Sequence, residues 1–234
     1  DFFLQADTWI ALLTLTFLEI VLGIDNIIFI SIVAGKLPEH QQKKARLIGL
    51  SLALIVRVIL LLGITWLIGL TDPVITISTF SLSWKDIILF VGGLFLIAKS
   101  TSEIHHKVEG DEEEVKVKKV NAFSAALVQI VLLDIIFSFD SILTAVGLTN
   151  EIILMVIAVI VSILVMMIFA GAISDFINRH PTLQVLALSF LILIGFMLIV
   201  EALHYEVPKG YIYFAVFFSL LVEIINIRVR KKNS

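Results

Sequence analysis

Long apolar blocks, rather than short alternations of apolar and polar residues, organise this chain of 234 residues. A helix needs about 20 mostly apolar residues to cross the roughly 30 Å hydrocarbon core of a bilayer. Seven stretches are long enough, or nearly so. They run over about 9–34, 47–70, 85–101, 122–147, 151–173, 183–203 and 211–227. The pattern predicts an all-α, polytopic membrane protein with seven transmembrane helices.

The composition agrees with this class. The chain is 59% hydrophobic and only 16% charged, and its mean hydropathy is +1.08. In a typical soluble domain about a quarter of the residues are charged. There is no Cys, so disulfides and thiolate metal ligands are both excluded.

Basic residues are distributed unevenly between the two sets of connections. If the N-terminus lies outside, two Lys residues fall on the outer side, fourteen Lys and Arg residues fall on the cytoplasmic side, and Arg57 lies within the second span. Cytoplasmic loops of membrane proteins carry the excess of Lys and Arg. We therefore expect a multi-pass protein of the inner (plasma) membrane, with the N-terminus outside and the C-terminus inside.

The chain contains a weak internal repeat. The segment "TFLEIVLGIDNII" (16–28) aligns with "VLLDIIFSFDSIL" (131–143) at an offset of 115. The aligned polar pairs are Glu19 with Asp134, Asp25 with Asp140, and Asn26 with Ser141. Further along, "GLFLIAK" (93–99) matches "GFMLIVE" (195–201) at an offset of 102. Two copies of such a unit are typical of secondary transporters, whose sites lie near the bilayer midplane.

Three spans per copy imply that the two copies have opposite orientations across the membrane. We expect one transmembrane domain over 1–234. Its parts are repeat one (about 9–101), a cytoplasmic loop (about 102–121), an inverted repeat two (about 122–203) and a last helix (about 211–227).

The polar residues of the first span need a physical account. Glu19 and Asp25 are six positions apart, which leaves them about 120° short of facing the same way on an ideal helix. Gly23 lies between them and Ser138 holds the matching place in the fourth span. Gly weakens a helix and permits local unwinding. We therefore predict that the first and fourth helices are broken or kinked at these residues and cross near the bilayer centre.

Carboxylates gathered at that point would repel one another strongly. Either some of them take up a proton, or a cation binds among them. Carboxylate, amide and carbonyl oxygens suit Mg²⁺, Ca²⁺ or Mn²⁺, whereas softer metals prefer sulfur and imidazole. The predicted metal ligands are Glu19, Asp25, Asn26, Asp134, Asp140 and Ser141.

Other charged residues in or near the spans are candidates for a counter-ion or gating role. Arg57 could neutralise the acids, or it could pair with Glu201 or Glu223 to hold helices together. Lys99 and Glu201 hold matched positions in the repeat and could pair with each other. Intramembrane charges are usually functional, so we keep all four as candidates.

Negative findings narrow the function. The sequence has no Walker loop, no GxGxxG after a strand and no HExxH. We therefore expect no enzyme activity and no cofactor. The expected partners are the lipid bilayer, a divalent cation and protons, and no nucleic acid is expected.

Three motifs resemble those of the TerC family of integral membrane proteins: "FLEIVLGIDNIIFI", "LLDIIFSFDSI" and "VPKGYIYFAVFFSLLVEIIN" (207–226). The family is named for tellurium resistance and includes bacterial manganese exporters. The resemblance implies seven spans in the inverted arrangement and efflux of Mn²⁺ or a related divalent cation. It carries the family's acidic motif residues onto Glu19, Asp25 and Asn26 and onto their repeat partners.

Taken together, the sequence favours a secondary transporter that exports Mn²⁺ from the cytoplasm in exchange for protons. A different class stays open: a membrane scaffold or sensor of metal or tellurite stress that moves no ion and acts through the loop at 102–121. A channel and an exporter of organic cations are further alternatives.

Overall fold

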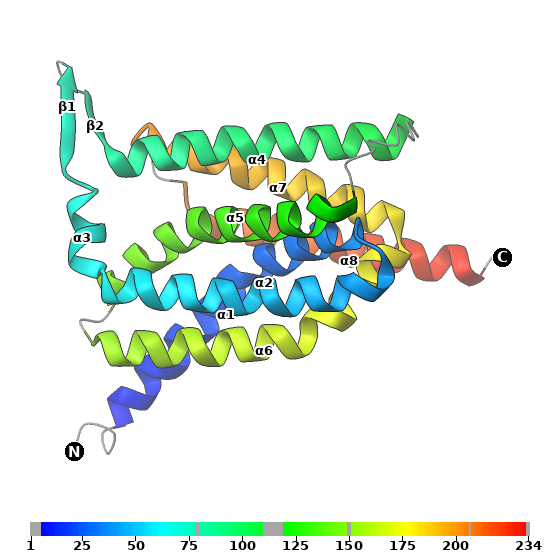
Figure 1. The fold of residues 1–234 in the computed structure, drawn as a ribbon, viewed down its shortest axis with the longest axis horizontal. Helices are drawn as coiled ribbons and strands as arrows, with labels where there is room; N and C mark the ends of the chain where they lie inside the picture. Colours follow the sequence, from blue (N-terminus) through cyan, green and yellow to red (C-terminus); the bar gives the residue numbers. More distant parts are fainter. Residues whose placement is uncertain (1–5, 78–79, 110–118, 149–150, 206, 233–234) are drawn as a thin grey trace. The chain divides into compact units, whose positions relative to one another are not determined.

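The computed structural model describes residues 6–77, 80–109, 119–148, 151–205 and 207–232. Long helices dominate these residues (Figure 1). The helices are α1 (Ala6–Gly35), α2 (Glu39–Leu62), α3 (Ile64–Gly69), α4 (Trp84–Glu109), α5 (Lys119–Leu148), α6 (Ile152–Arg179), α7 (Pro181–Ala202) and α8 (Lys209–Lys232). All but the short α3 are long and apolar enough to cross a membrane, which gives seven candidate spans among the described residues. The predicted all-α, polytopic membrane architecture is confirmed.

The second and third predicted spans differ most from the helices observed. The second predicted span is divided at Gly63, which ends α2 and precedes α3. The third was expected to end at residue 101, but α4 continues to Glu109. Glu103, assigned to a solvated loop from the sequence, is instead 5% exposed and pairs with Lys99 at 2.9 Å one helical turn away. Residues 110–118 of the predicted loop lie outside the described residues.

A two-stranded antiparallel hairpin between α3 and α4 was not predicted. Its strands are β1 (Pro73–Ile77) and β2 (Phe80–Ser83), with Ile75 opposite Leu82. The signal was present in the alternating, partly β-branched run "PVITI" and in "FSLS". A search for transmembrane spans does not detect such a segment, because it is too short to cross the bilayer.

The chain divides into two compact units. The first comprises Asp1–Asp72 and Val115–Phe176, and therefore holds α1, α2, α3, α5 and most of α6. The second comprises Pro73–Glu114 and Ile177–Ser234, with the hairpin, α4, α7 and α8. Each unit thus combines helices from both predicted repeats. The inverted repeat, the single domain and the membrane orientation remain predictions.

Helices α4 and α7 run side by side and antiparallel in the second unit (Figure 1). Near the start of α4 and the end of α7, Lys85 Nζ lies 3.1 Å from Glu201 Oε1. At the opposite ends of the two helices, Lys107 donates a hydrogen bond to the side-chain oxygen of Gln184. Polar contacts therefore lie at both ends of this antiparallel pair.

Candidate ion-binding site

Three helices of the first unit bring buried charges together. Glu19 lies in the middle of α1, Asp134 in the middle of α5, and Arg57 in α2. Arg57 Nη1 donates to Glu19 Oε2 at 3.0 Å, and Arg57 Nη2 donates to Asp134 Oδ1 at 2.7 Å. One guanidinium therefore joins the two carboxylates that the sequence repeat aligns. We call Glu19, Arg57 and Asp134 the ion triad.

Asp134 is the most heavily bonded member of the triad. Arg57 Nε also donates to Asp134 Oδ1 at 3.1 Å, and the amide of Asn26 on α1 donates to the same oxygen at 3.2 Å. The hydroxyl of Ser138, one turn along α5, donates to Asp134 Oδ2 at 3.2 Å. Both oxygens of this carboxylate are thus satisfied by neighbours from three helices.

Burial makes these contacts obligatory. Glu19 is 4% exposed, and Arg57 and Asp134 are each 3% exposed. Removing a charge from water carries a penalty of several kcal/mol, which only close pairing and hydrogen bonding can offset. The two carboxylates and one guanidinium also leave the triad with a formal charge of −1. The cluster is therefore an anionic site that holds a cation, and the cation it holds is a side chain.

The first and fourth helices were expected to be broken or kinked: α1 and α5 run as uninterrupted helices through Gly23 and Ser138, so the breaks are absent, and a kink at these residues stays a prediction. Gly23 has a different physical role. A methyl group on Gly23 would lie 2.4 Å from the sulfur of Met166, so the missing side chain of Gly23 leaves room for the end of the Met166 side chain from α6. Ser138 serves as a donor to Asp134 instead of unwinding the backbone. The acids meet because helices pack together, without exposing backbone carbonyls.

The remaining predicted ligands have different surroundings. Ser141 is buried and its hydroxyl donates to the backbone carbonyl of Ser138 at 3.2 Å. Asp25 and Asp140 lie within α1 and α5, but their side chains are outside the part of the chain that the structure describes. Among the described residues, no group of three or more His, Asp or Glu residues forms a metal-ligand set. The described site is a pair of acids with an amide and a hydroxyl beside it.

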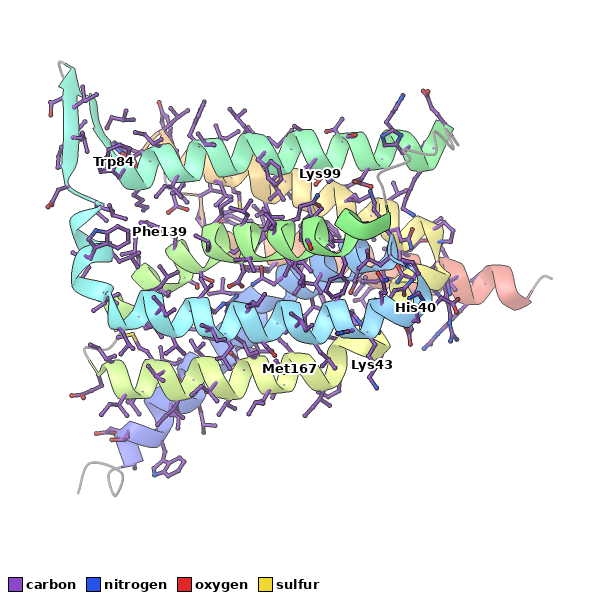
Figure 2. The ribbon with its side chains drawn as sticks, in the orientation of Figure 1. His40, Lys43, Trp84, Lys99, Phe139 and Met167 are labelled. Carbon is purple, nitrogen blue, oxygen red and sulfur yellow. The ribbon has the colours of Figure 1, made fainter. Side chains whose placement is uncertain are left out.

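The other candidate charged residues have partners in the second unit. Lys99 pairs with Glu103 and Glu201 pairs with Lys85, so the predicted contact between Lys99 and Glu201 is wrong. The two side chains lie at matched repeat positions on antiparallel helices, which places them at opposite ends of the helix pair. Figure 2 labels Lys99 well along α4. Of the two readings of Arg57, the structure supports the counter-ion.

Glu223 contacts its own helix. The amide of Asn226, three residues along α8, donates to Glu223 Oε2 at 3.5 Å. This contact lies within one helix, and Glu223 is not a member of the ion triad.

Sequence reasoning missed a second polar cluster at the start of α4, where Figure 2 shows Trp84 beside the hairpin. The backbone N–H and the hydroxyl of Ser83 donate to Asp86 Oδ2 at 2.8 and 2.7 Å, and the backbone N–H of Asp86 donates back to the Ser83 hydroxyl at 3.2 Å. This reciprocal pair is a capping box, and "SWKD" (83–86) was its readable signal. His204 Nε2, beyond the end of α7, lies 3.0 Å from Asp86 Oδ2. The cluster joins a helix start to a helix end and serves packing.

Comparison with known proteins identifies relatives along the whole chain. The profile described as "Integral membrane protein TerC family" matches residues 4–234. A UPF0053 inner membrane protein, YgdQ of Escherichia coli K12, is 54% identical over 227 residues, which cover 97% of this chain and 95% of YgdQ. A UPF0053 protein of Haemophilus influenzae is 48% identical over 96% of this chain and 95% of its own length.

A longer relative shares the same region. YoaE, another UPF0053 inner membrane protein of Escherichia coli K12, is 45% identical over all of this chain, which covers 45% of YoaE. No solved structure matches the chain.

Proposed function

Because this chain belongs to the integral membrane protein TerC family, we propose that it is a secondary transporter that exports a divalent metal cation, Mn²⁺ above all. It is a multi-pass protein of the inner membrane, like the relatives named inner membrane proteins. On this proposal the metal enters from the cytoplasm, exchanges its water for oxygen ligands in the middle of the spans, and leaves on the outer side.

One observation carries the proposal: two buried carboxylates from α1 and α5 meet at a single cation in the middle of the spans. Ionisable groups are rare in transmembrane helices, and where they occur they mark ion pathways and proton relays. A pair that served packing alone would need one acid for one base. Here Glu19 and Asp134 share Arg57, so two acids meet a single base.

The chemistry of the neighbouring groups supports a hard divalent cation as the substrate. The triad supplies two carboxylates, the side-chain amide of Asn26 and the hydroxyl of Ser138 lie beside them, and the chain has no Cys. Such oxygens favour Mn²⁺, Mg²⁺ and Ca²⁺ over zinc and copper. Asp25 and Asp140, one α1 residue and one α5 residue, complete the proposed ligand set from the sequence repeat.

Exchange for protons is part of the proposal. It is motivated by the four acids that the two motifs supply, which exceed the charge of one divalent ion. Export into proteoliposomes should then depend on the pH gradient. Transport at the same rate with and without the gradient would remove this coupling and leave metal export itself untouched.

The test of the proposed function is Mn²⁺ tolerance and cellular Mn²⁺ content in cells that depend on this chain for export. Four single variants address the site: Glu19→Gln, Asp25→Asn, Asp134→Asn and Asp140→Asn. Each should raise cellular Mn²⁺ and lower tolerance, because each removes one charged oxygen ligand while keeping the side-chain size. The amount of folded protein in the membrane is measured alongside.

Asp175→Asn is the matched control, since Asp175 is an exposed acid on α6 in the same unit as the triad. It should leave tolerance unchanged. Normal tolerance in all four site variants, at wild-type protein levels, would refute the proposed site.

The rival function, a scaffold or sensor that moves no ion, depends on the segment 102–121. Neutralising the charges of 110–118 separates the two functions. An exporter should keep Mn²⁺ tolerance after this change, whereas a scaffold should lose its protective effect.

A further inference from the structure

Arg57 contacts the same two carboxylates that the proposed metal substrate would use. Its guanidinium uses all three of its nitrogen positions on the two carboxylates: Nη1 on Glu19, and Nη2 and Nε on Asp134. Arg presents its donors in a rigid planar fork that matches carboxylates well. The side chain is 3% exposed, so water does not share these contacts.

The oxygens that Arg57 occupies are those that a metal would need. A divalent ion binds carboxylate oxygens directly, at about 2.0–2.6 Å. Asp134 Oδ1 already accepts hydrogen bonds from two nitrogens of Arg57 and from Asn26, and Asp134 Oδ2 accepts from Ser138. A metal ion among these atoms would be a second positive centre within a few ångström of the guanidinium, where like charges repel strongly in a low dielectric. A metal ion that bound Glu19 Oε2 and Asp134 Oδ1 would therefore have to displace Arg57 from them.

We propose, on the basis of the export function above, that Arg57 is a tethered competitor of the transported cation. It holds Glu19 and Asp134 when the metal has left, and it withdraws from them when a metal binds. The guanidinium thus neutralises buried acids that would otherwise be left exposed to hydrocarbon with no partner.

The competitor lowers the affinity of the site for metal and so favours release. When a ligand binds only one state of a protein, its apparent affinity is the intrinsic affinity multiplied by the fraction of molecules in that state. Arg57 keeps the metal-free site closed on itself, so only the fraction with Arg57 withdrawn is available. An exporter needs such weakening, since a site that binds its substrate too tightly does not let it go.

The experiment measures Mn²⁺ binding by calorimetry and Mn²⁺ flux in proteoliposomes with the purified full chain. Arg57→Gln should bind Mn²⁺ about tenfold more tightly than the wild type, while its flux at saturating Mn²⁺ falls severalfold. Millimolar guanidinium chloride, far below denaturing concentrations, should weaken Mn²⁺ binding by the variant by supplying the missing cation, and should leave wild-type binding unchanged. A residue that merely holds helices together would give weaker binding and lower flux, with no response to guanidinium.

Arg46→Gln is the control. Arg46 is a second buried arginine on α2, and its Nη1 donates to Ser174 on α6 at 3.0 Å. It lies 11 residues before Arg57, about 16 Å along the helix, and its loss should leave Mn²⁺ affinity unchanged. If Arg57→Gln does not fold, Arg57→Lys takes its place. A lysine keeps the charge but cannot bridge both acids with a fork, so Mn²⁺ affinity should rise by a smaller factor.

The outcomes separate this inference from the proposed function. A wild-type chain that neither binds nor transports Mn²⁺ refutes both. A wild-type chain that binds and transports Mn²⁺, with equal or weaker binding in the folded Arg57 variant, overturns the competitor alone.

Discussion

Gly93 of α4 and Gly195 of α7 pack backbone against backbone. A methyl group on Gly93 would lie 2.5 Å from the carbonyl oxygen of Gly195, and one on Gly195 would lie 2.8 Å from the carbonyl oxygen of Gly93. The next contacts repeat the relationship, with Gly93 facing Ile199 and Gly195 facing Ile97. Small residues let transmembrane helices approach closely, and van der Waals packing then holds them together. The reciprocal contact joins the two segments that the offset of 102 aligns.

Substituting either glycine of this pair should destabilise the second unit. Gly93→Ala and Gly195→Ala force apart two backbones that have no flexible side chain to move aside. Each should lower the free energy of unfolding by about 1–3 kcal/mol, as overpacking does in closely packed cores. Thermal unfolding in detergent measures the effect.

Gly171→Ala on α6 is the control for this pair, because a methyl group there meets nothing within 4 Å. Alanine is the better helix former by about 1 kcal/mol, so this variant should be as stable as the wild type or more so. Equal stability of Gly93→Ala and Gly171→Ala would contradict the close packing of α4 and α7.

The role of Gly23 can be separated from helix unwinding. Gly23→Ala should destabilise the chain only modestly, because the methyl group meets the Met166 sulfur and the flexible end of Met166 must shift. In a Met166→Ala background the same change should cost much less, with a coupling energy of about 0.5–3 kcal/mol in a double-mutant cycle. Additive effects of the two substitutions, measured by thermal unfolding, would show that Gly23 does not act through its contact with Met166.

The two acids of the ion triad should differ in their effect on stability. Asp134 accepts hydrogen bonds from Arg57, Asn26 and Ser138, whereas Glu19 is bonded to Arg57. Asp134→Asn should therefore cost about 3–5 kcal/mol, the range for breaking a buried ion pair. Glu19→Gln should cost less, because Asp134 still neutralises Arg57. Apparent melting temperatures in detergent test the order, and a larger loss for Glu19→Gln would reverse this assignment.

His204 holds a left-handed backbone conformation, with φ of 65°, at the end of α7. The backbone N–H of Tyr205 donates to the carbonyl of Val200, and that of His204 to Glu201, which is the Schellman pattern that glycine usually completes. His204→Ala and His204→Gly both lose the contact with Asp86. Only the alanine variant keeps the strained backbone, so it should be less stable than the glycine variant by about 1–2 kcal/mol. Identical melting temperatures for the two variants would show that backbone strain at this residue has no effect.

The pair between Lys85 and Glu201 should matter little to stability. Both side chains are 25% exposed, and partly solvated ion pairs contribute about 0–1 kcal/mol. Glu201→Gln and Lys85→Met should each shift the melting temperature only slightly. Loss of Mn²⁺ export in a stable Glu201→Gln variant would return this residue to the transport pathway, where the sequence first suggested it.

Much of the fold was predictable because its signals are local. Each of the seven predicted spans corresponds to a long helix, since the number of apolar residues needed is fixed by the thickness of the membrane, although α2 ends at Leu62 within the second span. The hairpin and the extension of α4 to Glu109 were missed. Both lie outside the apolar blocks, where the stability of a strand or of a helical turn depends on neighbours distant in the sequence.

The candidate site was predicted in part. The repeat identified Glu19 and Asp134 as partners, and the structure brings both to Arg57. The predicted helix breaks did not occur, because the geometry of one helix gives the angle between its own residues but not how a neighbouring helix reaches them. Met166, which occupies the space beside Gly23, carries no sequence signal that connects it to α1.

The sequence by itself determined the number of candidate membrane spans and the presence of acids deep within them, since both follow from composition along short stretches of chain. Only the tertiary structure decided which charges meet. Arg57 is separated by 38 residues from Glu19 and by 77 from Asp134, and its choice of these partners depends on the rotation and packing of three helices. A buried charge must find an opposite charge within about 3–4 Å to offset its lost hydration, and that distance is a property of the packed fold.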